Sequence, residues 1–389
     1  MASVYLKDSP SGVLAEGILG DELRIEPLSG PSERRDGAIP HRVYTIDNSE
    51  KYYGDVVQAE GAESGPFLTE RSGEIPDAVY LNISIVVDSV IHHGLERMKK
   101  SSLEYVAILM NAVNLRYAEF TEPGFQIKLD VVQLLSMTQE RDVLGIVGSV
   151  LFHPNVLPKL VNFTDSPQFS NSAAVFLLTG RDLSGPSGSS TKGIAMLGQL
   201  CRKERVGIGE DIPGSYSGMA TVTHEVLHIV GAGHDGSLAP VRMTGIARTK
   251  CSAGPYIMSP YQTTRNAHWM SNCTQEQVRF LLKSKRPRCW MPLHSEDLTT
   301  STLPASKINV TEFCLLVKPR VYTGGNVEPD CRIRCTTRTN IVGYFTGIDG
   351  MECASRNGTV CVKGQCISRN KIPRTVTGVP RQVSEASEV

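Results

Sequence analysis

Residues 224–235 read His-Glu-Val-Leu-His-Ile-Val-Gly-Ala-Gly-His-Asp, a run that combines a helix, its end and metal-binding side chains. His224 and His228 stand four residues apart, so on an α-helix both imidazoles project from one face and can bind one tetrahedral metal ion. Such a helix cannot supply a third ligand on the same side. Gly231 can take the left-handed conformation that ends a helix, which lets His234 approach the metal from another direction.

The chemistry that this pattern predicts is hydrolysis at a catalytic zinc ion. Three neutral imidazoles leave one coordination position open, whereas structural zinc sites are closed by four protein ligands. Glu225 follows the first histidine but lies too far round the helix to bind the same ion. We expect it to accept the proton of the attacking water and later pass it to the leaving amine. The alternative, three surface histidines on an ordinary helix, requires this spacing to arise by chance.

The chain has 389 residues with 40 Lys+Arg and 40 Asp+Glu, so its formal net charge is zero. A neutral chain is not expected to bind nucleic acid, because polyanion binding depends on surplus Lys and Arg. No apolar run approaches the roughly 18 residues of a membrane-spanning helix, so the sequence predicts no membrane span. The charge is unevenly distributed, because residues 314–389 hold 11 Lys+Arg against 6 Asp+Glu.

All ten cysteines lie between Cys201 and Cys366. An even number confined to one half of a chain indicates disulfides and an oxidising compartment. Five Asn-x-Ser/Thr glycosylation signals agree with secretion, at Asn82, Asn162, Asn272, Asn309 and Asn357. The first residues, Met-Ala-Ser-Val-Tyr-Leu-Lys-Asp, do not form a signal peptide, so we expect the sequence to begin inside a longer precursor.

Hydrophobic patterning predicts an α/β architecture with a largely parallel sheet. Residues 102–119 have apolar positions at helical spacing and predict a helix. Apolar runs in the same region predict strands over residues 78–90, 125–135, 173–178 and 194–198. Short β-like runs precede them at residues 3–6, 23–25 and 42–46.

A second motif follows the histidines, because residues 254–260 read Gly-Pro-Tyr-Ile-Met-Ser-Pro. After a three-histidine pattern, this segment resembles the Met-turn of the metzincin metallopeptidases, with Met258 as the hydrophobic floor beneath the zinc. Asp235 directly after the third histidine and Met-Ser-Pro in the turn resemble the adamalysin/reprolysin branch, which includes snake-venom and ADAM-type enzymes. The secreted format with one compact C-terminal module is most similar to tick salivary reprolysin-like metalloproteases.

This resemblance implies a zincin-like metzincin catalytic domain, with a mixed twisted sheet and an active-site helix. It implies that Asp235 anchors the end of that helix to the Met-turn. Residues 193–197 correspond to the edge strand that pairs antiparallel with substrate backbone. Two disulfides of the family are matched by the pairs Cys201–Cys289 and Cys251–Cys273.

The domain organisation combines composition with this resemblance. Six cysteines crowd into a short C-terminal stretch, which is typical of a disulfide-stapled module and is similar to the disintegrin-like/cysteine-rich modules of thrombospondin-repeat ADAM proteases. The sequence leaves open how they pair: Cys314, Cys331, Cys335, Cys353, Cys361 and Cys366. The expected parts are a partial propeptide-like region (1–75), a reprolysin-type zinc peptidase domain (76–292), a linker (293–313), the cysteine-rich module (314–368) and a disordered tail (369–389).

The sequence departs from the family pattern in two respects. No cysteine precedes Cys201, so a propeptide cysteine switch is absent, and latency requires steric blockage or a further N-terminal segment. Asn82 stands where reprolysins place an acidic calcium ligand, and Trp290-Met291-Pro292 lacks their Asn or Asp. These substitutions put the family's structural calcium site in doubt.

We therefore expect a secreted endopeptidase that holds one Zn²⁺ through the three histidines. The resemblance implies extracellular protein substrates, such as matrix proteins or fibrinogen. The basic C-terminal module is a candidate contact for matrix or anionic glycans. The rival hypothesis is an adhesion or antagonist protein that acts through residues 314–366, but a protein that has lost catalysis need not keep Glu225. A third hypothesis, a cytosolic peptidase, predicts ten free thiols.

Overall fold

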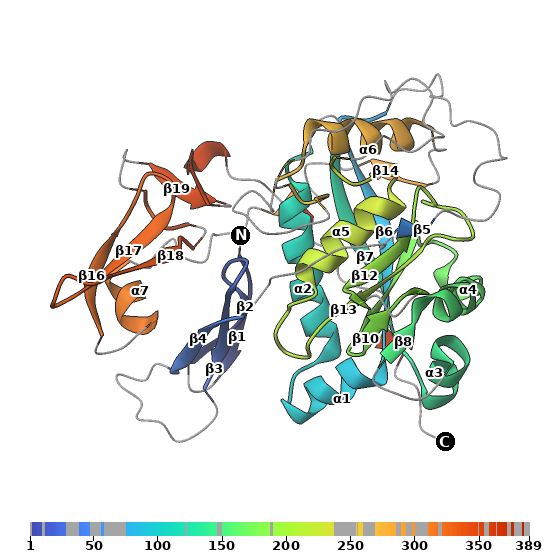
Figure 1. The fold of residues 1–389 in the computed structure, drawn as a ribbon, viewed down its shortest axis with the longest axis horizontal. Coiled ribbons are helices and arrows are strands. Elements are labelled where there is room, and N and C mark those ends of the chain that lie inside the picture. Colours follow the sequence, from blue (N-terminus) through green and yellow to red (C-terminus); the bar gives the residue numbers. More distant parts are fainter. Residues whose placement is uncertain are drawn as a thin grey trace. The chain divides into compact units, whose positions relative to one another are not determined.

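The computed structural model in Figure 1 divides into two compact units, each assembled from two separate parts of the chain. The terminal unit combines Met1–Asn48 with Thr300–Thr375, and the central unit combines Ser49–Thr299 with Val376–Val389. The structure does not describe residues 1, 10–11, 29–38, 47–55, 58–74, 121–122, 146–149, 187–189, 237–253, 255, 260–268, 285–288, 293–297, 300–309, 318–320, 349, 354–357, 363, 372–374, 377–382 and 385–389.

The central unit is built around an eight-stranded mixed sheet with the order β22-β7-β6-β9-β13-β12-β5, to which β14 adds beside β6. Four neighbouring strands run parallel: β7 (Gly124–Leu134), β6 (Ala78–Val87), β9 (Ala174–Thr179) and β13 (Val206–Glu210). Two strands pair antiparallel with this group: β12 (Gly193–Met196) with β13, and β14 (Met291–Pro292) with β6. The two ends of the sheet are β22 (Val383–Ser384) and β5 (Val56–Val57).

Helices cover both faces of this sheet (Figure 1): α1 (Ser89–Arg97), α2 (Ser102–Tyr117), α3 (Met137–Leu144), α4 (His153–Thr164), α5 (Met219–Ile229) and α6 (Asn272–Ser284). The side chains of β9 show which helices lie on which face of the sheet, because successive side chains of a strand point in opposite directions. Val175 and Leu177 belong to the apolar core that α3 and α4 complete. Phe176 points the other way and, with Ile229 of α5, lies against Gly207. A small sheet of β11 (Ser190–Thr191), β10 (Asp182–Ser184) and β8 (Val150–Phe152) lies apart.

The predicted elements of the central unit are confirmed, with shifts of a few residues at their ends. The strand predicted over 78–90 is the clearest case: it ends at Val87, because Asp88 begins a helix. The Asp88 carboxylate accepts a hydrogen bond from the Ile91 amide at 3.0 Å and so caps α1. The sheet is largely parallel, as expected, and β12 and β14, which run antiparallel to their neighbours, make it mixed.

Asp88 also joins three elements at the carboxyl ends of β6 and β9. Its Oδ2 accepts hydrogen bonds from the Thr179 hydroxyl at 2.6 Å and from Arg181 at 2.7 Å. Arg181 forms a second ion pair with Glu140 of α3. Asp88 is completely buried, so these partners offset the cost of removing its charge from water.

A second buried network fixes where α5 begins. The Tyr105 hydroxyl of α2 donates to Asp211 Oδ2 at 2.6 Å, and the Tyr216 amide donates to the same hydroxyl at 2.7 Å. Asp211 Oδ1 accepts from the Gly218 amide at 2.8 Å, one residue before the helix. Burial, together with the neighbouring Asp211 charge, raises the pKa of Tyr105 well above its usual value, so its hydroxyl stays a donor.

The terminal unit contains an N-terminal antiparallel sheet and a disulfide-rich part. The sheet is formed by β1 (Ser3–Ser9), β2 (Gly12–Ile18), β3 (Leu23–Pro27) and β4 (His41–Thr45). The disulfide-rich part contains helix α7 (Val310–Val317), the meander β16 (Tyr322–Val327), β17 (Arg332–Thr337) and β18 (Val342–Thr346), and the hairpin β19 (Thr359–Val362) and β20 (Gln365–Ser368).

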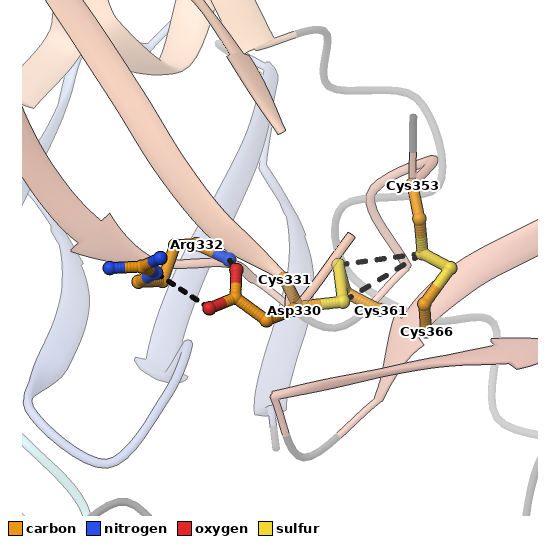
Figure 2. The surroundings of a disulfide bond; sticks show 6 residues. All are labelled: Asp330, Cys331, Arg332, Cys353, Cys361 and Cys366. Carbon is orange, nitrogen blue, oxygen red and sulfur yellow. Dashed lines mark hydrogen bonds and ion pairs between the residues drawn. A yellow bond between two sulfur atoms is a disulfide. The ribbon is translucent and has the colours of Figure 1, made fainter. Parts of the chain in front are cut away.

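Three disulfides staple this part and give the connectivity that the sequence left open: Cys314–Cys335, Cys331–Cys361 and Cys353–Cys366. Figure 2 shows the last two side by side, with the Cys353 sulfur 3.7 Å from the sulfurs of both Cys331 and Cys361. Beside them Arg332 Nε donates to Asp330 Oδ2 at 2.6 Å. The sulfur atoms fill the interior that a module of this size cannot fill with apolar side chains.

The compact units differ from the domain organisation expected from the sequence. Residues 1–48 share a unit with the cysteine-rich part, whereas the sequence suggests one continuous propeptide-like region over 1–75. Helix α7 begins at Val310, inside the expected linker 293–313, because its Phe313 and Cys314 pack into the core of the terminal unit. In the expected tail the structure has a 3₁₀ turn at Arg369–Lys371, β21 (Thr375–Val376) and β22. Among the described residues, no helix has the length and apolarity needed to cross a membrane.

The Tyr105–Asp211 network gives a first prediction. Tyr105→Phe removes a buried donor to a carboxylate, so the free energy of unfolding should fall by about 1–3 kcal/mol. Urea denaturation followed by circular dichroism measures this difference. Tyr344→Phe is the matched control, because the Tyr344 side chain is 54% exposed and should change stability little. Equal losses in the two variants would show that the network contributes nothing to stability.

Candidate metal centre

Three histidine side chains from α5 and the segment after it converge in the central unit. Their ring centroids lie 4.7 Å (His224–His228), 4.8 Å (His228–His234) and 5.2 Å (His224–His234) apart. One ring nitrogen from each lies within 4.8 Å of the others. His224 and His228 are completely buried, and His234 is partly buried. We call these three residues the histidine centre.

The turn after α5 brings the third histidine to the other two. The helix ends at Ile229, and Gly231 has a left-handed φ of 96°, a conformation that side chains with a Cβ rarely adopt. The Gly231 amide donates to the His228 carbonyl at 2.8 Å, which closes the last turn. The Gly233 amide then donates to Gln277 Oε1 of α6 at 2.7 Å, so the reversed chain is held from outside.

Backbone carbonyls set the tautomers of the two helix histidines. His224 Nδ1 lies 2.7 Å from the Ile257 carbonyl oxygen, and His228 Nδ1 lies 2.7 Å from the Ala232 carbonyl oxygen. A carbonyl oxygen can only accept, so each Nδ1 carries the proton. A neutral imidazole protonated on Nδ1 presents a lone pair on Nε2, which is the arrangement found at metal-ligating histidines.

The spacing of the nitrogen atoms fits one zinc ion. His224 Nε2 and His234 Nε2 lie 3.1 Å apart. Two nitrogens bound to a tetrahedral zinc at about 2.0–2.1 Å are separated by about 3.3 Å. The donor set therefore matches zinc in chemistry and in geometry. A second cluster of metal-ligating residue types, Cys331, Cys353 and Cys361, offers no thiolate because all three are in disulfides.

Glu225 is completely buried at the middle of α5. Its side chain lies against Gly193, the first residue of β12, so the carboxylate is placed between the helix and that strand. The outer edge of β12 pairs with β5 in parallel register, Ala195 opposite Val56 and Met196 opposite Val57. The strand beside the carboxylate is therefore paired along both edges in this chain.

Met258 and Asp235 join the segment after α5 to the turn at residues 256–259. The Asp235 amide donates to the Met258 carbonyl at 2.8 Å, and Met258 is completely buried. The Ser271 hydroxyl donates to Asp235 Oδ1 at 2.6 Å. Burial raises the pKa of Asp235 to about 6, against the opposing effects of the Ser271 hydrogen bond and of His234.

The structure describes some of the other residues singled out by the sequence. The structure contains the Cys201–Cys289 disulfide. Cys251 falls outside the described residues, so the Cys251–Cys273 pair stays a prediction. Asn162 on α4 and Asn272 at the start of α6 are exposed, and Asn309 and Asn357 fall outside the described residues. Asn82 is half-buried inside β6, between β7 and β9, and its glycosylation stays a prediction.

Several positioning contacts had no signal in the sequence. Gln277 and Ser271 hold the segment after α5, and the Tyr117 hydroxyl of α2 donates to the Thr223 carbonyl at 2.8 Å. Each joins residues far apart in the chain, and each residue type is common on helices and turns. Only the packing of α2 and α6 around α5 brings them together.

The Asp235–Ser271 hydrogen bond gives a second prediction. Asp235→Ala should weaken zinc binding by about 10- to 100-fold, because the segment that carries His234 loses its anchor. Ser271→Ala should reproduce part of the loss, and the double variant should lose less than the sum of the two. Competition with a zinc-binding dye measures these affinities. Asp165→Ala, which removes an exposed surface carboxylate, is the control. Strictly additive losses would contradict the coupling.

Comparisons with known proteins agree with this centre. Residues 78–271, which include α5 and the histidine centre, match a family that is described as "Metallo-peptidase family M12". The venom metalloproteinase antarease of Tityus serrulatus is 26% identical over 317 residues, covering 74% of this chain and 77% of that protein. A protein of Bombyx mori, named as a disintegrin and metalloproteinase with thrombospondin motifs like, is 25% identical over 77% of this chain and 46% of its own length.

A third relative is snake venom metalloproteinase H5 of Deinagkistrodon acutus, 25% identical over 58% of this chain and 50% of its own. The three relatives are all named as metalloproteinases, and the family match spans the strands β6, β7, β9, β12 and β13 of the sheet, helix α5 and the segment up to Ser271. The chain belongs to metallo-peptidase family M12 and is a zinc metalloendopeptidase of the reprolysin type.

Proposed function

We propose that the histidine centre holds the catalytic zinc ion of this endopeptidase and that Glu225 is its general base. One observation carries the assignment: the Ile257 and Ala232 carbonyls each accept a hydrogen bond from the Nδ1–H of a helix histidine and leave both Nε2 atoms as lone-pair donors. Hydrogen bonds of this kind orient ligands toward a metal. An ordinary surface helix has no need of them.

Zinc and Glu225 have different roles in the proposed reaction. When bound, zinc supplies a Lewis acid that polarises the scissile carbonyl and lowers the pKa of water to about 7. Glu225 accepts the proton of the attacking water on a carboxylate oxygen and then delivers it to the leaving amine nitrogen. The complete burial of Glu225 keeps bulk water from competing for that proton.

The substrate backbone is proposed to add to the outer edge of β12, antiparallel to it, by the β-strand addition that many peptide-binding sites use. In this chain β5 pairs with that edge and runs in the parallel direction. A substrate strand must therefore take the place of β5. This contact offers a steric route to latency in a sequence that has no cysteine before Cys201.

The wider setting is also a proposal. We propose a zincin-like metzincin fold for the central unit, with Met258 as the apolar support beneath the zinc. We propose a secreted protein that cleaves extracellular proteins, and the venom metalloproteinases among its relatives support this. Four disulfides among the described residues agree with an oxidising compartment.

The alternative is a protein that acts by binding through its cysteine-rich part. One observation favours a binding role for that part: Arg332 lies over the exposed ring of Tyr344 at 5.3 Å, a pairing of cation and aromatic face open to solvent. The surplus of Lys and Arg over residues 314–389 supports a contact with anionic glycans or matrix.

The general base gives a third prediction. Glu225→Gln should lower kcat/KM for peptide cleavage by about 100- to 10,000-fold, because the acceptor of the water proton is lost. Bound zinc, measured by mass spectrometry of metals, should stay at one per chain. Both proteins should be assayed with a specific protease site placed within residues 58–74 and cut beforehand, since β5 covers the substrate edge. Chelation should abolish cleavage by the parent chain, and zinc should restore it.

The matched control is Glu204→Gln, which neutralises a carboxylate outside the histidine centre. Cleavage that survives Glu225→Gln would overturn the assignment of the base. If instead a biological effect of the protein survived while cleavage was lost, the binding function would become the better description.

A further inference from the structure

We infer that residues 1–48 are a permanent part of the terminal unit and stay bound to the cysteine-rich part after the chain is cut between the units. The sequence suggests a propeptide-like region at this end of the chain, and a propeptide is removed. The structure places the same residues in the core of another module, which a removable segment would leave open.

The shared core carries this inference. One apolar cluster contains Leu19 and Leu23 from the N-terminal sheet together with Phe313, Tyr322 and Ile333 from the cysteine-rich part. All five side chains are buried. Three further residues of the N-terminal sheet pack against the same cluster at its margin: Val4, Ile25 and Val43. The cluster also contains the buried disulfide sulfurs, so the two parts close over a common interior.

Hydrogen bonds hold the loop between β2 and β3 in one conformation, with Leu19 and Leu23 at its two ends. The Leu19 amide donates to the Leu23 carbonyl at 2.9 Å, which closes the loop. Arg24 is completely buried, and its Nη1 donates to the Gly20 and Leu23 carbonyls at 2.9 and 3.0 Å. A loop held in this way loses little conformational freedom when it packs, which favours a stable contact.

Neither part makes a full core alone. A four-stranded sheet from fewer than about 50 residues has one apolar face and too little volume to bury it. Separation would return both leucines to water at a cost of roughly 1.5–3 kcal/mol each. It would also uncover Phe313 and Tyr322. The N-terminal sheet therefore stays in place without a covalent link, since residues 1–200 contain no cysteine.

The test is a cut in the intact protein. Residues 49–54 are replaced by the recognition sequence of a specific protease, a position that separates residues 1–48 from β5. After cleavage in non-denaturing buffer, size-exclusion chromatography with mass spectrometry should find the N-terminal fragment with the rest of the chain. In denaturant the two should separate. A fragment that elutes alone from the cut parent protein in native buffer would overturn the inference.

Two matched variants locate the contact. Leu23→Asp places a charge in the shared core and should release the fragment, whereas Leu6→Asp, on the same sheet but 64% exposed, should not. Leu23→Ala, which keeps the sheet apolar, should give faster release than the parent. Retention of the Leu23→Asp fragment would contradict the assigned face. None of these substitutions lies in the central unit, which contains the histidine centre, so peptide cleavage should be unaffected.

A separate observation concerns Gly193, which we propose as a positioning residue for Glu225; this second inference rests on the proposed role of that carboxylate. A Cβ at position 193 would lie 2.6 Å from both Cγ and Oε1 of Glu225 and 2.7 Å from the Thr221 methyl group. Non-bonded carbon atoms do not approach so closely. Because Gly193 has no side chain, the side chain of Glu225 can occupy the space that a Cβ would fill.

The opposite strand completes this space. Gly193 of β12 pairs in register with Gly209 of β13. A Cβ at Gly209 would lie 2.9 Å from the Thr221 methyl group and 2.8 Å from the Phe176 ring. Thr221 and Glu225 are four residues apart on α5 and so point the same way. The two glycines pack against one face of α5, but of the two only Gly193 lies against the Glu225 carboxylate.

This difference supplies a matched pair of variants, Gly193→Ala and Gly209→Ala. Neither glycine has a left-handed φ, so alanine is tested for its contacts alone. Gly193→Ala should lower kcat by about 100-fold, the cost of a shift of about 1 Å in a catalytic group. The acidic limb of the pH profile of kcat/KM, which reports the base, should move. Gly209→Ala should lower the melting temperature while kcat and the pH profile stay near the parent values.

A double-mutant cycle on stability separates positioning from general packing. The destabilisation by Gly193→Ala should be smaller when Glu225 is already Ala, whereas Gly209→Ala should cost the same in both backgrounds. Equal kinetic effects of the two glycine variants, or no coupling to Glu225, would overturn the inference. Cleavage that survives Glu225→Gln would instead overturn the proposed function, so the two failures can be told apart.

Discussion

The convergence of three imidazoles on one point constrains the whole segment after α5. One helix can offer two of these ligands from a single face, and the third must come from chain that has left the helix. That chain must reverse within a few residues and must then stop moving, because a ligand misplaced by an ångström no longer binds. The left-handed Gly231 makes the reversal, and Gln277 and Ser271 hold the residues beyond it.

The turn at residues 256–259 contacts both the first histidine and the segment that carries the third. The Ile257 carbonyl accepts from His224, and the next carbonyl, that of Met258, accepts from the Asp235 amide beside His234. Two adjacent peptide groups therefore orient the first ligand and the segment of the third. Met258, whose side chain is completely buried, joins this turn to the segment after α5 through its backbone carbonyl. A shift of this turn would disturb both at once.

The central sheet, the helices and the grouping of the three histidines could be predicted from local patterns, because apolar runs and four-residue spacings act within one element. The pairing of residues 1–48 with the cysteine-rich part could not, since nothing near Leu19 or Leu23 indicates a partner in residues 300–375. The same holds for Tyr105 and Asp211, whose side chains meet only after α2 packs on the sheet. The packing of α5 against Gly193 and Gly209 could not be predicted either, because a glycine in a strand indicates only that a side chain is absent.

The division of the terminal unit between the two ends of the chain sets an order of assembly. A ribosome adds about 5–20 residues per second, so roughly 250 residues between Asn48 and Thr300 require on the order of tens of seconds. During that interval Leu19 and Leu23 have no core to enter, and the N-terminal strands wait as exposed edges that invite incorrect pairing. Closure of the terminal unit requires residues 300–375, so it occurs only on chains whose peptidase has already been made.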